Sequence, residues 1–124
     1  MTAAVVLTPV SAPVAEHVLV VALDGALDYT NAERLRQDVE AALHEKHREL
    51  VLDLTGVSFC DSTGIRILLA VRKLMQDRDG AVTLASLNAR LARIFRLTGL
   101  ISAFTVVPGL AEAVDAVGTR STPR

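Results

Sequence analysis

From residue 18 onward, short apolar runs alternate with segments of helical periodicity, and this alternation limits the folds open to the chain. Residues 18–23, 50–54 and 81–85 each read as a buried strand. Between and after these runs, apolar residues recur every three or four positions, which predicts helices. Strands joined through helices pair in parallel, so the sequence predicts an α/β domain with a mainly parallel sheet.

Weaker signals complete the domain at both ends of the chain. Residues 5–10 read as a weak edge strand, 104–107 as a short edge strand and 110–117 as a last helix. The apolar N-terminus lacks a basic segment and contains two prolines, so we do not read it as a signal peptide. Residues 118–124 have the composition of a disordered tail. We therefore expect one domain over residues 5–117.

The composition argues against several classes of function. The net charge of −1, with one Tyr, three Phe and no Trp, is unlike a nucleic-acid-binding surface. No apolar stretch reaches the roughly 18 residues of a membrane-spanning helix. The single cysteine, Cys60, excludes an internal disulfide and suits a reducing compartment, where we expect a small residue that closes a strand. We expect a cytoplasmic protein.

The first predicted helix begins at a capping box, Thr30-Asn31-Ala32-Glu33, in which the Thr30 hydroxyl and the Glu33 carboxylate bond backbone amides. Its apolar face comprises Ala32, Leu35, Val39, Ala42 and Leu43. Basic residues gather at its end, and they are His44, Lys46, His47 and Arg48. A zinc-protease motif needs histidines four positions apart, not three, so we interpret this cluster as a solvated cationic helix end.

A polar break, Asp61-Ser62-Thr63-Gly64, separates the strand 50–54 and its continuation from a helix expected over 62–77. The backbone amides of a helix N-terminus attract negative charge. A hydroxyl there could be a simple cap or a site where a phosphate is added. Asp28 follows one predicted strand and Asp61 another, and the carboxyl ends of parallel strands share one edge. The two carboxylates could therefore flank Ser62 in a small acidic pocket.

The second helix has a core face and a side that leaves apolar residues outside it. The core face comprises Gly64, Ile67, Leu68, Val71, Leu74 and Met75. Ile65 and Leu69 project to the side, near basic residues, which are Arg66, Arg72 and Lys73. This side is either a docking surface or a face covered by another helix.

Enzymatic chemistry has little support in the sequence. No phosphate-binding P-loop and no Gly-x-Ser-x-Gly elbow is present, and Asp53 lacks the second aspartate, two residues on, of dehalogenase-type phosphatases. No histidine is placed to activate Ser62. On the third helix, Arg90, Arg93 and Arg96 are either its solvated face or a contact for an anion or a partner.

Four motifs follow one another along the chain: Gly25-Ala26-Leu27-Asp28, Leu50-Val51-Leu52-Asp53-Leu54, Phe59-Cys60-Asp61-Ser62-Thr63-Gly64 and Arg93-Ile94-Phe95-Arg96-Leu97-Thr98-Gly99-Leu100. In this order and spacing, the chain resembles the STAS domains, most closely the stand-alone bacterial anti-sigma factor antagonists, over about residues 5–117. Ala26 departs from the pattern, where a glutamate is common, and this weakens the acidic pocket. Arg66 is a frequent choice in the family.

The resemblance implies a mixed sheet of four or five strands with about four helices mainly on one side. It implies a regulatory binding protein, without enzymatic activity or cofactor, whose phosphoryl acceptor is Ser62 and whose nearby acidic positions are Asp28 and Asp61. The expected partner-binding residues are Thr63, Gly64, Ile65, Arg66, Leu69 and Lys73.

The implied partners are an anti-sigma factor that is also a serine kinase, and a PP2C-type phosphatase. In that family the unphosphorylated antagonist binds the anti-sigma factor and frees the sigma factor, whereas the phosphorylated form does not bind. An alternative is a STAS subunit of a larger signalling or transport-associated assembly that does not act on a sigma factor, with Thr63 as an additional acceptor.

Overall fold

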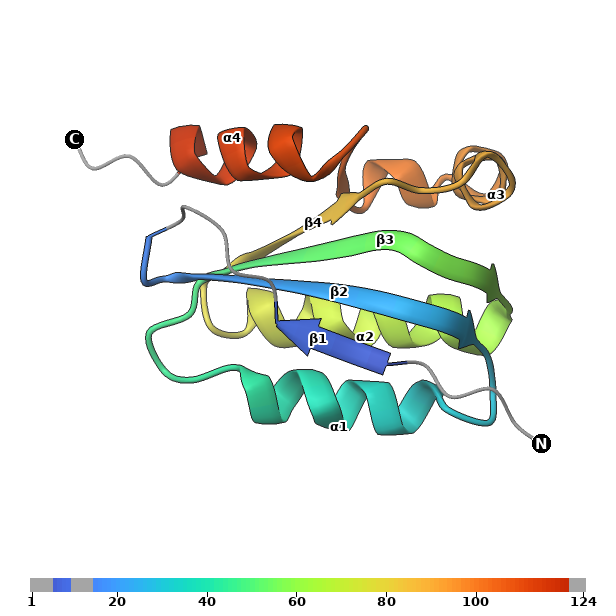
Figure 1. The fold of residues 1–124 in the computed structure, drawn as a ribbon, viewed down its shortest axis with the longest axis horizontal. Helices are drawn as coiled ribbons and strands as arrows, with labels where there is room; N and C mark the ends of the chain where they lie inside the picture. Colours follow the sequence, from blue (N-terminus) through green and yellow to red (C-terminus); the bar gives the residue numbers. More distant parts are fainter. Residues whose placement is uncertain (1–5, 10–14, 121–124) are drawn as a thin grey trace.

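The computed structural model describes residues 6–9 and 15–120, with side chains at 7–8 and 15–117. Five strands form one sheet in the order in which they occur along the chain. They are β1 (Val6–Pro9), β2 (Val18–Leu27), β3 (Glu49–Cys60), β4 (Ala81–Ala85) and β5 (Thr105–Val107). β1 pairs antiparallel with β2, and the other neighbours pair in parallel. The mixed, mainly parallel sheet is as predicted (Figure 1).

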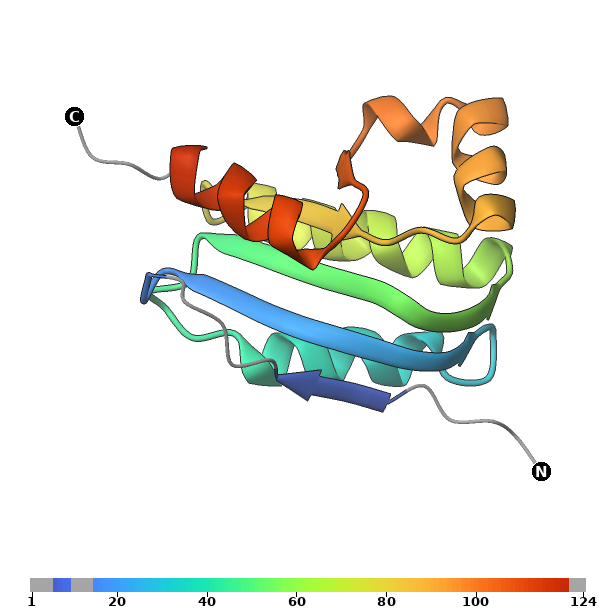
Figure 2. The same cartoon turned by 45° about the horizontal axis from the view of Figure 1, so that its top comes forward.

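The helices are α1 (Ala32–Ala42), α2 (Ser62–Gln76), α3 (Ala89–Thr98) and α4 (Leu110–Arg120), with a single 3₁₀ turn, η1 (Leu100–Ser102). Figures 1 and 2 show α1 and α2 side by side on one face of the sheet and α4 on the other. α3 lies at the end of the sheet where β2 and β3 finish. The resemblance implied helices mainly on one side; α1 and α2 share one face, α3 joins them in the larger core from the end of the sheet, and α4 packs on the smaller core of the other face.

Side chains alternate between the two faces of the strands because successive residues of a strand point to opposite sides. Along β3, Leu50 and Leu52 enter the larger core under α1 and α2, whereas Val51 enters a smaller core. The smaller core also receives Ala113 and Val117 of α4. Burial on both faces explains why β3 reads as a continuous apolar run.

β2 is longer than the sequence predicted. Asp24-Gly25 was expected to end this strand at residue 23, but the strand continues to Leu27 through irregular pairing with β3. Gly25 has a φ of 115°, which favours glycine and lets the strand bend without ending. Gly56 of β3 makes room for the neighbouring Asp24, since a Cβ atom there would lie 1.7 Å from the Asp24 Oδ1. The bend therefore carries β2 and β3 together to the same edge.

β3 is also longer than the predicted run 50–54, since it continues to Cys60. The remaining boundaries agree closely with the sequence. β4 spans the predicted residues 81–85, and α2 starts at Ser62 as expected. α3 is capped by Asn88, whose Oδ1 accepts a hydrogen bond of 2.8 Å from the Leu91 amide, and ends at Gly99 with a φ of 80°. α4 extends through Arg120, so residues 118–120 of the predicted tail are helical, and 121–124 lie outside the described residues.

Candidate functional site

The carboxyl ends of β2 and β3 lie side by side, because their last residues, Leu27 and Cys60, are partners in the parallel register. Asp28 and Asp61 directly follow these two residues. The Asp61 amide also donates to the Leu27 carbonyl oxygen over 3.1 Å, which fixes the start of α2 against the end of β2. The topology thus brings the two predicted acidic residues to one edge of the sheet.

Asp61 is the N-cap of α2. One carboxylate oxygen, Oδ1, accepts from the Gly64 amide at 2.9 Å, which satisfies an amide of the first turn. The other oxygen, Oδ2, accepts from the Tyr29 amide at 3.2 Å. A single carboxylate therefore caps α2 and ties the loop between β2 and α1 to it.

Ser62 is the first residue of α2, and its side chain is exposed. Because Asp61 does the capping, the Ser62 hydroxyl is not needed for it. Within the described part of the chain, that hydroxyl forms no hydrogen bond. Ser62 thus presents a free hydroxyl to solvent beside a carboxylate that is held in place, while the neighbouring Thr63 is half-buried.

The loop after β2 is organised differently, and the predicted capping box is wrong. The Thr30 hydroxyl and amide both donate to the Asp28 carboxylate, and the amide bond measures 2.9 Å. Hydrogen bonding from Thr30 holds the pKa of Asp28 below its ordinary value. Glu33 instead pairs with Arg36 on the exposed side of α1. The capping box is absent because α1 begins at Ala32, with Asn31 rather than Thr30 in the N-cap position.

The side chain of Asn31 forms two hydrogen bonds to the backbone of this segment. Its Nδ2 donates to the Ala26 carbonyl oxygen at 2.7 Å, and its Oδ1 accepts from the Asp28 amide at 3.1 Å. Asn31 occupies the N-cap position of α1 but forms no side-chain capping bond. Asn31 thus fixes the backbone of Asp28, and Thr30 holds its carboxylate.

Gly64 allows α2 to pack directly on the end of β2. A Cβ atom at this position would lie 2.7 Å from the Leu27 carbonyl oxygen and 2.8 Å from the Cys60 Sγ. The Leu27 carbonyl oxygen belongs to the backbone and cannot move away without displacing the end of β2. The glycine of the polar break is therefore a packing requirement, and it brings the first turn of α2, with Ser62, to the sheet edge.

The predicted partner-binding side of α2 is only partly exposed. Ile65 and Leu69 are half-buried and pack against the edge of the larger core, so they are less free than the helical projection suggested. Arg66 is exposed, and Lys73 forms an ion pair of 2.7 Å with Asp77 one turn on. An exposed surface pair of this kind contributes little to stability and leaves Lys73 accessible.

Two aromatic side chains at this end of the molecule are exposed, and the sequence did not predict their exposure. Tyr29 is 77 % exposed and Phe59 is 44 % exposed. Tyr29 adjoins Asp28, and Phe59 lies next to Cys60. Exposed aromatic residues are frequent at protein interfaces. Simple alternation of side chains along β3 does not predict that Phe59 is exposed, because the irregular pairing with β2 interrupts that alternation.

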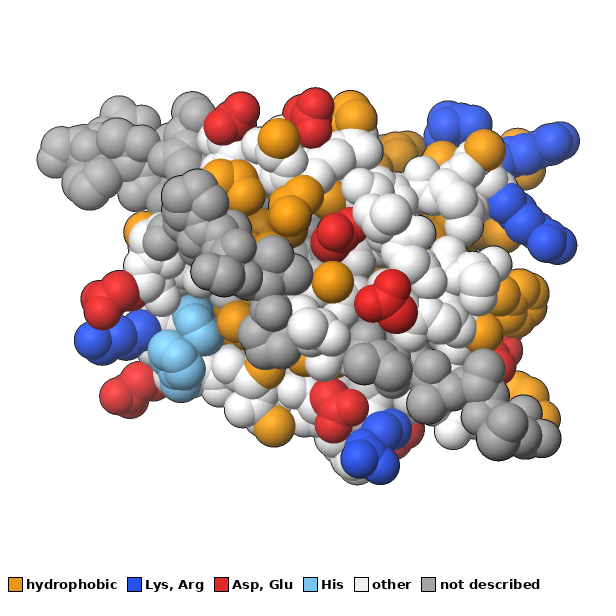
Figure 3. Space-filling model, in the orientation of Figure 1, with side chains coloured by type: hydrophobic (Ala, Val, Ile, Leu, Met, Phe, Trp, Pro, Cys, Tyr) orange, Lys and Arg blue, Asp and Glu red, His pale blue; other side chains and the backbone are white. Residues whose placement is uncertain are grey.

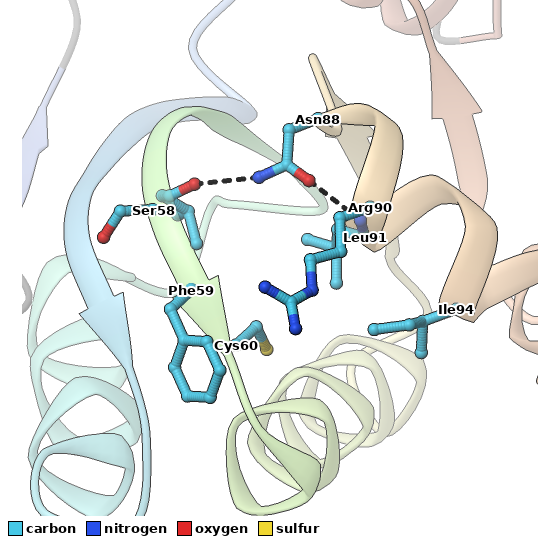
Figure 4. Close-up of a pocket in the computed structure, with 8 residues that line it drawn as sticks. Ser58, Phe59, Cys60, Asn88, Arg90, Leu91 and Ile94 are labelled. Carbon is cyan, nitrogen blue, oxygen red and sulfur yellow. Dashed lines mark hydrogen bonds between the residues drawn. The ribbon is translucent and has the colours of Figure 1, made fainter.

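Cys60 lies in a shallow pocket of about 70 Å³ between the end of β3 and α3 (Figure 4). Burial, and secondarily the charge of Asp61, raise the pKa of this half-buried thiol to about 12. The thiol is therefore protonated at neutral pH and is a poor nucleophile. Cys60 closes the strand, as predicted.

The histidine cluster after α1 differs from the solvated cationic end that was expected. His47 is buried, its ring stacks on that of His44 with centroids 3.8 Å apart, and its Nδ1 accepts from the His44 amide. Burial, followed by the charges of His44 and Arg78, lowers the pKa of His47. Among the described residues, no group of His, Cys, Asp or Glu side chains could hold a metal ion.

The chain belongs to the STAS domain family, since the model of that family matches residues 9–113. A curated relative, the "Putative anti-sigma factor antagonist BtrV" of Bordetella bronchiseptica, is 30 % identical over 84 % of this chain and 90 % of its own. In the described part of the chain, no helix is long and apolar enough to cross a membrane.

Solved structures give the same family at the level of the fold. An anti-sigma factor antagonist from Mycobacterium paratuberculosis is 28 % identical, with a TM-score of 0.77, and the match covers 91 % of this chain and 93 % of that one. The murine anion transporter Slc26a9 matches with a TM-score of 0.75 and 24 % identity, over 83 % of this chain but 18 % of the transporter chain. The transporter shares the fold alone.

Proposed function

We propose that this protein is a cytoplasmic anti-sigma factor antagonist whose binding to its partner is switched off by phosphorylation of Ser62. The single observation that carries the proposal is the exposed, unbonded hydroxyl of Ser62 beside a cap that Asp61 already supplies. The names of the relatives support the regulatory role. In this role the chain is a binding protein and not an enzyme.

The expected effect of the phosphate follows from charge. A phosphoserine at neutral pH carries about −1.5 to −2 charges. The amides at the start of α2 favour that charge, but the Asp61 carboxylate is already bonded to two of the amides in the region. Asp61 therefore repels the phosphate, and Arg66, one turn along, is the nearest cation in sequence on α2.

The larger effect arises at the interface with the partner. A dianion that loses its water among docked side chains costs several kcal/mol unless the partner supplies a counter-charge. Such a cost is enough to abolish micromolar binding, whose total free energy is about −8 kcal/mol. The switch needs no change of fold in the antagonist.

The proposed contact surface is the exposed start of α2 and its outward side. It comprises Thr63, Ile65, Arg66, Leu69 and Lys73, with Asp28 and Asp61 on the acceptor side, whereas Gly64, which was also expected there, is buried against the ends of β2 and β3. The half-buried Ile65 and Leu69 provide apolar area at the edge of the core, and Arg66 provides charge. The partner would be an anti-sigma factor with serine kinase activity, and a PP2C-type phosphatase would restore the free serine.

Intact-mass analysis tests this proposal. The pure chain is incubated with ATP and each candidate anti-sigma factor kinase of the same genome, and the modified residue is mapped. We expect one phosphate on Ser62, no phosphate on Ser62→Ala, and normal phosphorylation of the matched control Thr30→Ala. We also expect Ser62→Ala to bind the kinase as wild type does.

Two outcomes would contradict the proposal. Phosphorylation of Ser62→Ala to the wild-type level would show that another residue is the acceptor. Isolation of the chain in a stable larger assembly, with no kinase that binds or modifies it, would favour the alternative of a STAS subunit in a signalling or transport-associated complex.

A further inference from the structure

α3 has one face buried in the core and another that faces outward. Leu91 and Phe95 are buried in the larger core. The opposite stripe carries Arg90, Arg93, Ile94 and Leu97, which stand at positions i, i+3, i+4 and i+7 of one helical face. Leu97, a large apolar side chain, is 75 % exposed. An outward stripe that mixes arginines with large apolar residues has the composition of an interface core.

A pocket adjoins this stripe. It lies between the end of β3 and α3, has a volume of about 70 Å³, and is lined on one side by Phe59 and Cys60 and on the other by Leu91 and Ile94. Figure 4 shows the Arg90 side chain reaching from α3 toward Cys60 along the pocket. Because about 10–15 Å³ of such a volume is enough to hold one water molecule, the pocket has room for the end of an apolar side chain.

The charges of α3 are not balanced locally. The α3 sequence contains no acidic residue, and within the described residues Arg90, Arg93 and Arg96 form no ion pair. On α1, by contrast, Arg34 pairs with Asp38, and Arg36 pairs with two glutamates. Figure 3 shows Lys and Arg side chains gathered at the end of the molecule occupied by α3, next to hydrophobic ones.

We propose that the outward stripe of α3 and the adjoining pocket bind an acidic segment of a partner protein, with one apolar side chain of that segment seated between Phe59 and Ile94. Complementary charge would steer the segment to the arginines, and the pocket would fix its register. The defined pocket favours a protein segment over a lipid surface, which would need only the stripe.

This site does not include Ser62, so it extends the proposed function to a second contact. Binding at α3 does not depend on the phosphate, and a partner held there stays close to Ser62 after the contact at α2 has been broken. Linked contacts raise the effective concentration of one site for the other.

A peptide titration tests the proposal independently of any kinase. The probe is a short fluorescein-labelled peptide that alternates acidic residues with leucine, and fluorescence anisotropy measures its affinity for the full chain. We expect Arg90→Glu/Arg93→Glu to weaken binding at least tenfold. The matched control Arg34→Glu/Lys46→Glu changes the net charge equally on another side of the molecule and should bind as wild type does.

Four further measurements locate the contact. Leu97→Ser, at an exposed position that does not endanger folding, should weaken binding several-fold, as should replacing the leucines of the peptide by serine. Ser62→Asp should bind the peptide as wild type does. Amide chemical shifts in NMR spectra should change at Phe59, Arg90 and Ile94 when the peptide is added.

The proposal is overturned if wild type does not bind the peptide, or if the two charge-reversal variants lose affinity equally. It is also overturned if phosphatidylserine vesicles bind through α3 and the peptide does not, or if α3 instead mediates self-association in sedimentation experiments. None of these measurements involves phosphorylation, so failure of this proposal is distinguishable from failure of the Ser62 switch.

Discussion

The segments that follow β2 and β3 begin with the same kinds of residue but form different hydrogen bonds. Each follows a strand end in the same register pair, and each begins with an aspartate and contains a hydroxyl residue. After β2, the carboxylate of Asp28 takes up the hydroxyl of Thr30. After β3, the carboxylate of Asp61 bonds backbone amides and leaves the hydroxyl of Ser62 free. The availability of a hydroxyl is therefore decided by what the neighbouring carboxylate binds.

The largest expected effect tests the functional side of this comparison. Ser62→Glu should weaken binding to the anti-sigma factor kinase about 100-fold, or ~2.7 kcal/mol, because it places a charge where the partner docks. Thr30→Ala, in the other loop, should bind within about threefold of wild type. Isothermal titration calorimetry with the kinase measures both. Equal binding by Ser62→Glu and wild type would remove Ser62 from the interface.

The next effect concerns the close packing that positions the loop after β3. Gly64→Ala should lower the free energy of unfolding by about 1–3 kcal/mol, because the added methyl group meets the Leu27 carbonyl oxygen and Cys60. Urea unfolding followed by circular dichroism measures the loss. Gly109→Ala is the matched control, since its nearest neighbour is the flexible carboxylate end of Glu112. A loss no greater than that of the control would contradict the packing role.

A smaller effect separates the two aspartates. Asp61→Ala should cost about 1–2 kcal/mol of unfolding free energy, because the α2 cap and the acceptor for the Tyr29 amide are both lost. Asp28→Ala should cost less, since it breaks only bonds within an exposed loop. Thermal unfolding of both variants and of Asp61→Asn, which keeps one acceptor oxygen, ranks them. A larger loss for Asp28→Ala would reverse the comparison.

The smallest effect lies at the opposite end of the sheet, in the buried His47. Its pKa in the folded protein is lowered from the ordinary 6.5, so the unfolded chain binds more protons in the window just below that value. Stability should therefore fall as the pH drops through about 6.5, and rise again toward neutrality. His47→Asn should flatten this dependence in urea unfolding at pH 5 and pH 7. An unchanged slope would rule out His47 as its source.

Much of the fold follows from local pattern. The apolar runs defined β4 and the first half of β3, and Asn88 and Gly99 defined the ends of α3, because strand periodicity and capping residues act over a few positions. β2 shows where local pattern stops being sufficient. Asp24-Gly25 has the composition of a turn, but pairing with β3 over Gly56 keeps the strand extended to Leu27.

The sequence predicted which acidic residues come together at this edge of the sheet but did not predict their hydrogen bonds. The order of strands and polar breaks indicated that Asp28 and Asp61 share an edge, which the parallel register confirms. The capping box at Thr30 failed because α1 begins at Ala32, so that Asn31 and not Thr30 occupies the N-cap position, and because Glu33 pairs with Arg36. The exposed Phe59 and the pocket beside α3 depend on how β3 bends and where α3 packs, and no short motif encodes either.

The sequence by itself determined the α/β class, the family and the serine at the head of α2, because periodicity, turn chemistry and motif order are local properties of the chain. Only the tertiary structure decided that Asp61 caps both α2 and the neighbouring loop, that Gly64 must be glycine, and that the Ser62 hydroxyl stays free. Hydrogen bonds between segments distant in sequence and contacts between a helix and a strand end exist only after the sheet has formed, and they assign the cap of α2 to Asp61 rather than to Ser62.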